Sequence, residues 1–149
     1  MSATYTDPSA IAIGTSEAHR QFLRGKCRES LYFLCKAVLG FRDFTPQLHR
    51  PACDFVQNQA HIRKLFMLPR SFFKSYLATI GYPIWLVIQE PKGRLRGMNE
   101  RILIANATAT NAEQFLAKIK SIFERDALFQ WLFPECIPDF ASRHITWNV

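Results

Sequence analysis

An apolar run that enters a tight turn and leaves it as a helix constrains this chain more than any other feature. The segment is Leu65–Ser75, LFMLPRSFFKS. Residues 64–68 predict a short strand, and the apolar spacing from Tyr76 to Ile88 predicts a largely buried helix. A strand, a tight turn and a helix N-terminus in this order can form a loop whose backbone N–H groups cradle phosphate oxygens.

The Lys-Ser pair at the end of this segment has the chemistry of a phosphate loop. A lysine there reaches the terminal phosphates and the next hydroxyl holds Mg²⁺, which are the roles expected of Lys74 and Ser75. The standard pattern GxxxxGK[ST] would place glycines at Leu68 and Phe73, and neither is present. A positive φ at Phe73 would cost about 1–2 kcal/mol, which phosphate hydrogen bonds of about 1.5–3 kcal/mol each could offset. The alternative is an exposed lysine at an ordinary helix start.

A second apolar run completes the expected fold class. Residues 101–106 (RILIAN) predict a strand buried on both faces, and Thr110 with Glu113 has the spacing of a helix capping box. Strand, helix and strand in this order predict a parallel pair with a right-handed crossover. We therefore expect an α/β fold, specifically an incomplete P-loop NTPase domain with parallel strands, preceded by an N-terminal helical region.

The N-terminal third predicts helices. Residues 1–16 are small and polar and predict a flexible tail, followed by a domain over 17–149. Apolar residues at helical spacing predict one helix over 17–39 that stops at Gly40. Thr45 and Pro46 are suited to begin a second helix, in which Pro51 should cause a kink or a break.

Composition limits the classes of function. The 149 residues are 48% hydrophobic, enough for a packed core, and carry a net charge of +7, which suits polyanionic partners such as nucleic acid or nucleotide phosphates. No signal peptide and no membrane-spanning run is recognised.

The four cysteines form no CxxC pair, and His49 with Cys53 has a spacing that can bind metal but lacks a second ligand pair. We expect all four cysteines to be reduced thiols and the His49–Cys53 pair to have a structural role.

In an ordered series of segments the chain resembles the ATPase part of the large terminase subunits of tailed bacteriophages, the motors that drive DNA into capsids. The similar segments, beginning with a variant Walker A loop, are 68–75 (LPRSFFKS), 81–85 (GYPIW), 99–106 (NERILIAN), 108–115 (TATNAEQF) and 129–135 (FQWLFPE). The resemblance extends from about Cys27 onward.

The resemblance implies ATP and Mg²⁺ as cofactors. Lys74 would contact the β- and γ-phosphates, Ser75 would ligate Mg²⁺, and Arg70 would stabilise charge on the γ-phosphate, so that Arg70 and Lys74 are the candidate catalytic residues. The candidate nucleotide-binding residues are Pro69, Arg70, Ser71, Phe72, Phe73, Lys74 and Ser75. Ser71 stands where many members have glycine. Thr108 or Thr110 would lie near the site, although a turn or cap role is the simpler interpretation.

The resemblance also implies partners and a location: double-stranded DNA, other terminase subunits and the capsid portal, no membrane, and the cytoplasm of the bacterial host. After Pro138 no apolar strand ends in the paired acids that hydrolysis requires, so we expect the front of a longer protein that does not turn over ATP alone. The competing hypothesis is a basic DNA-binding or interaction module without a working nucleotide site. A small phosphate-loop kinase is disfavoured because the glycines and a catalytic base are missing.

Overall fold

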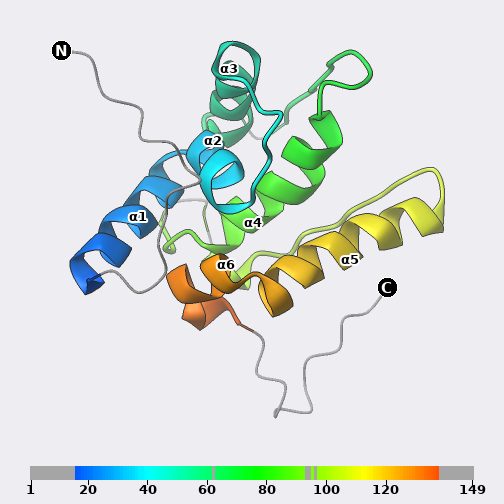
Figure 1. The fold of residues 1–149 in the computed structure, drawn as a ribbon. Helices are drawn as coiled ribbons and strands as arrows, with labels where there is room; N and C mark the ends of the chain where they lie inside the picture. The colour runs from blue at the N-terminus through cyan, green and yellow to red at the C-terminus, as the bar shows by residue number, and fades with distance from the viewer. Residues whose placement is uncertain (1–15, 62, 93–94, 96, 138–149) are drawn as a thin grey trace.

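The computed structural model describes residues 16–61, 63–92, 95 and 97–137, and the regular structure within them is helical (Figure 1). The α-helices are α1 Glu17–Glu29, α2 Leu31–Phe33, α3 Pro46–Gln57, α4 Tyr82–Val87, α5 Ala109–Arg125 and α6 Ala127–Leu132. Two π-helical segments, η2 Leu34–Val38 and η3 Tyr76–Gly81, and two 3₁₀ turns, η4 Gly97–Asn99 and η5 Pro134–Cys136, complete the order. Among these residues no helix has the length and apolar character needed to cross a membrane.

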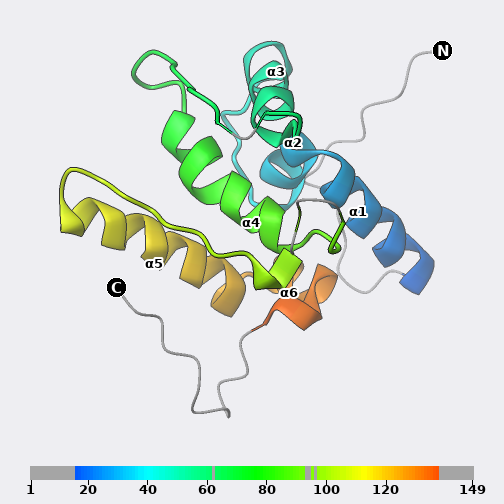
Figure 2. The ribbon, with the colours of Figure 1, turned by 180° about the vertical axis from the view of Figure 1, so that it is seen from behind.

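The helix formed by η3 and α4 lies at the centre of the fold. It lies between α1–α3 and the pair α5 and α6, as both views show (Figures 1 and 2). Leu77, Ile80 and Ile84 on this helix are almost fully buried, because its apolar residues face η2 on one side and α5 on the other. The predicted buried helix over Tyr76–Ile88 is therefore confirmed, and the bend expected at Gly81 and Pro83 coincides with the change from π- to α-helix.

The predicted α/β fold is wrong, because the described residues contain no strand and only one isolated bridge, between Lys92 and Leu95. Residues 64–68 and 101–106 have no regular secondary structure and no ladder partner. Their side chains are not buried on both faces: Leu65, Met67 and Leu103 are 80%, 77% and 90% exposed. An apolar run favours extended backbone, but a strand also needs a neighbour about 4.8 Å away, and within the described chain neither segment has one.

Two helix boundaries differ from the prediction, each for a local reason, and the break considered at Pro51 does not form. The single helix expected over 17–39 is broken at Ser30, whose extended backbone and hydroxyl cap α2. It does stop at Gly40, where φ is +67°. The helix α3 continues past Pro51. Finally, α5 is capped by the Thr108 hydroxyl rather than by Thr110, so the predicted capping box does not form.

A charged cluster ties α1 to the segment after α6. The Arg24 guanidinium donates to the Glu135 carboxylate at 2.5 Å and to the Leu132 carbonyl at 2.6 Å. Desolvation raises the pKa of Glu135, but the hydrogen bond from Arg24 and the charges of Arg24 and Arg28 outweigh it, and the pKa is lowered overall. The ionised carboxylate therefore contributes to holding the two ends of the described chain together.

Candidate phosphate-binding loop

The loop over 69–73 connects the segment 64–68 to a helical turn at Lys74 and Ser75, which leads into η3. It projects from one end of the central helix (Figures 1 and 2). Two of its residues, Ser71 and Phe73, have left-handed backbone, with φ of 68° and 49°. Non-glycine residues rarely adopt this conformation, and those that do concentrate at functional sites.

The left-handed residues leave a run of backbone N–H groups without acceptors. Within the described part of the chain, no N–H from Ser71 to Ser75 donates to a protein acceptor. The first helical hydrogen bond runs from the Leu77 N–H to the Phe73 carbonyl, at 3.0 Å. Successive N–H groups that alternate between right- and left-handed backbone converge on one side and form an anion-binding concavity. Residue 73 is also where the standard phosphate loop has its second glycine, the residue before the lysine.

The basic side chains of the loop are placed in two different ways. The Lys74 Nζ folds back over the loop and donates to the Leu68 carbonyl at 3.1 Å. Arg70 is exposed, and no described residue pairs with its guanidinium. One cation therefore closes the loop while a second is free to meet a ligand.

Aromatic packing holds the strained residue in place. The Phe73 ring lies 6.3 Å from the ring of Phe44, 6.1 Å from His49 and 6.0 Å from Tyr76, measured between centroids. His49 is buried and stacks on Phe44, with centroids 4.4 Å apart. Because the surrounding rings fix the Phe73 side chain, its positive φ is maintained without a ligand.

The remaining predicted site residues differ in their placement. Pro69 and Phe72 are exposed on the loop, and Ser75 is half-buried at the first turn of the helix, where its side chain makes no capping hydrogen bond. The Thr108 hydroxyl accepts the Asn111 N–H, which assigns it to the cap of α5. The described residues contain no group of three or more His, Cys, Asp or Glu side chains that could hold a metal ion.

The His49–Cys53 pair has a structural environment. The His49 Nδ1 accepts the Thr45 backbone N–H at 2.9 Å, and Cys53 is fully buried. Burial, followed by the interaction with the neighbouring Cys53 thiol, raises the pKa of Cys35 well above its ordinary value. All four cysteines are free thiols. The pair therefore belongs to the core beside the loop.

An aromatic cavity beside the loop was not predicted. Its lining residues are Gly40, Phe41, Arg42, Asp43, Phe44, Phe73 and Tyr76. The spacings Phe41–Phe44 and Phe73–Tyr76 each place two rings three residues apart, which was the available signal. The sequence could not indicate that these two pairs meet.

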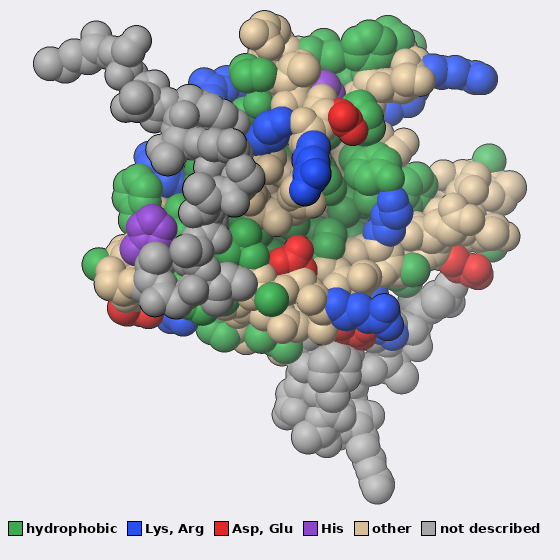
Figure 3. Space-filling view, viewed as in Figure 1, with side chains coloured by type: hydrophobic (Ala, Val, Ile, Leu, Met, Phe, Trp, Pro, Cys, Tyr) green, Lys and Arg blue, Asp and Glu red, His purple; other side chains and the backbone are tan. Residues whose placement is uncertain are grey.

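Comparison with known proteins gave no relative: no family model, no curated protein and no solved structure matches this chain. The interpretation of the loop therefore depends on its own residues and geometry. The Lys and Arg side chains elsewhere on the face seen in Figure 3 are scattered rather than gathered into one patch.

Proposed function

We propose that the loop over 68–75 binds the phosphates of a nucleotide. The observation that carries the proposal is the run of free N–H groups around two left-handed residues, Ser71 and Phe73, at the start of a helix. A helix N-terminus adds favourable dipole for an anion. The exposed Arg70 and Lys74 supply positive charge at the same place. This support does not depend on a parallel sheet.

We further propose ATP with Mg²⁺ as the ligand, with Lys74 on the β- and γ-phosphates, Ser75 on the metal and Arg70 on the γ-phosphate. The support is the resemblance of the ordered segments to the large terminase subunit, and the chain would be the front part of such a DNA-packaging motor. Double-stranded DNA, other terminase subunits and the capsid portal would then be its partners, in the cytoplasm of a bacterial host. The chain alone would bind ATP without turnover.

Thermal unfolding with and without Mg-ATP tests the proposal. A ligand at 100 times its Kd stabilises a fold by about 2.7 kcal/mol, equivalent to roughly 5–10 °C for a chain of this size. Lys74→Ala should remove this rise, and Arg70→Ala should reduce it. Lys92→Ala is the matched control, because Lys92 is also exposed and lies on a separate loop. An equal rise in Lys74→Ala and wild type would refute the proposed site.

Binding measurements on the same protein distinguish nucleotide binding from the competing function. A basic DNA-binding module would show no response to ATP, while duplex DNA would bind with a steep dependence on salt. The net charge of +7 suits either kind of polyanion. Steady-state ATP hydrolysis that Lys74→Ala abolishes would contradict the claim that the chain alone does not turn over ATP.

A further inference from the structure

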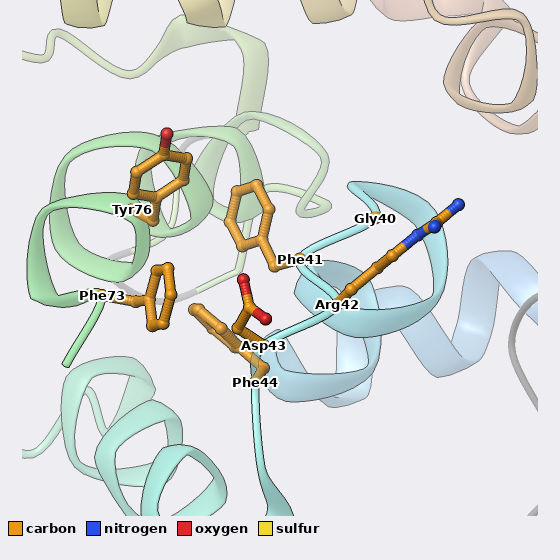
Figure 4. Close-up of a pocket in the computed structure, with 7 residues that line it drawn as sticks. All are labelled: Gly40, Phe41, Arg42, Asp43, Phe44, Phe73 and Tyr76. Carbon is orange, nitrogen blue, oxygen red and sulfur yellow. The ribbon is translucent and has the colours of Figure 1, made fainter. Parts of the chain in front are cut away.

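An open cavity of about 260 Å³ lies between the turn after η2 and the start of η3 (Figure 4). Its volume is several times the roughly 30 Å³ that one water molecule occupies in the liquid. The turn contributes residues 40–44, and the helix side contributes Phe73 and Tyr76. Phe73 belongs to both the phosphate loop and this cavity, but the other lining residues lie outside the loop.

Four aromatic rings in the wall of the cavity pack against one another, each next to two of the others. The centroid distances are 5.2 Å from Phe41 to Phe44, 6.3 Å from Phe44 to Phe73, 6.0 Å from Phe73 to Tyr76 and 5.4 Å from Tyr76 back to Phe41. The interplanar angles range from 55° to 90°, so the rings are not stacked on one another as parallel plates. The electron-rich faces of such rings attract cations within about 6 Å.

An unpaired carboxylate completes the lining. The Asp43 side chain is directed among the rings of Phe41, Phe44 and Phe73, while the Arg42 side chain extends away from it (Figure 4). Asp43 is exposed, and no described residue forms an ion pair or a hydrogen bond with its carboxylate.

Two nearby lysines already have other partners, and the Arg42 guanidinium, which also lines the cavity, points away from Asp43 (Figure 4). The Lys36 Nζ donates to the Arg42 carbonyl at 2.5 Å. The Lys118 Nζ lies 4.4 Å from the centroid of the Tyr76 ring and 2.5 Å from its hydroxyl. The Tyr76 ring therefore already has one cation–π contact within the fold, and the carboxylate of Asp43 is left for a cation from outside.

We propose that this cavity binds a guanidinium group, such as the side chain of an arginine from another molecule. A guanidinium is planar and weakly hydrated, stacks on aromatic rings and pairs with a carboxylate through two parallel hydrogen bonds. Rings together with one unpaired carboxylate match this combination. A neutral planar ligand would use the rings but would leave the Asp43 charge without a partner.

Titration of the full chain, followed through the aromatic resonances of phenylalanine and tyrosine by NMR, tests the site. The probe is Nα-acetylarginine amide, and its control is Nα-acetylcitrulline amide, which has nearly the same shape without the charge. We expect saturable binding of the arginine probe and at least tenfold weaker binding of the citrulline probe. Equal binding of the two probes, or no binding of the arginine probe, would overturn the proposal.

Variants place the binding at this cavity. Asp43→Asn should weaken arginine binding at least fivefold, whereas Asp54→Asn, the same change at an exposed position on α3, should leave it unchanged. Phe41→Leu should also weaken it. Lys74→Ala should retain it, so that failure here and failure of nucleotide binding can be told apart. Full affinity in Asp43→Asn, or tighter binding of adenosine than of the arginine probe, would contradict a guanidinium site.

Discussion

Replacing Leu103 by serine tests whether the apolar segment 101–106 lies outside the core. Burying a leucine side chain fully is worth about 1.5–3 kcal/mol, and Leu103 is 90% exposed. The remaining tenth corresponds to about 0.2–0.3 kcal/mol, which should lower the melting temperature by roughly 1 °C or less at about 2–4 °C per kcal/mol. If the segment were instead a buried strand, the loss would be that of a core leucine, about 2–5 kcal/mol.

Thermal and urea unfolding, followed by far-UV circular dichroism and by tryptophan fluorescence, to which the buried Trp85 contributes, would measure the difference. Leu77→Ala is the matched control, because Leu77 is fully buried on the central helix and its truncation should cost about 2–5 kcal/mol. A drop of more than about 5 °C in Leu103→Ser would refute the reasoning, since it would show that Leu103 is packed in the folded protein.

Two further predictions concern the backbone and the charged cluster. Gly97→Ala should lower the free energy of unfolding by at least about 1–2 kcal/mol in urea, because φ is +57° and an added Cβ would lie 2.2 Å from the Gln89 carbonyl oxygen. Gly25→Ala, in open space on α1, should raise that free energy by up to about 1 kcal/mol. The reverse order of the two variants would contradict the structure. Because the folded pKa of Glu135 is lowered, its pairing with Arg24 should stabilise above the ordinary value of 4.5 and be lost as pH falls through the folded pKa. The melting temperature of Glu135→Gln should therefore fall less between pH 6 and pH 3 than that of wild type, and parallel profiles would exclude this contribution.

The helices were predictable to the extent that their signals are local. The apolar spacing around Leu77 and Ile84 identified the central helix, and Gly40 marked the end of the N-terminal helical region. Ser30 was missed, because a serine in a helical pattern is either an exposed position or a cap, and the choice depends on the packing of the helices on either side.

The sequence locates the candidate loop. It indicates the conformation of the loop only in one respect, namely that a phosphate loop would require a positive φ at Phe73. The pattern before Lys74 suggested that residue 73 needs a positive φ, and the structure has φ of 49° there. What maintains it, the contact of Phe73 with Phe44 and His49, joins residues about 25–30 positions apart. No local pattern reports such a contact. The function of the loop stays a proposal.

The sequence by itself determined most of where this chain is helical and where it turns, because these depend on side-chain period and on local backbone preference. Only the tertiary structure decided that the runs at 64–68 and 101–106 are not strands, since a ladder requires a neighbour that a run of residues cannot specify. It likewise decided that two pairs of aromatic residues line one open cavity together with Asp43. Both outcomes depend on which segments come together in space, and that is settled by packing of the whole chain.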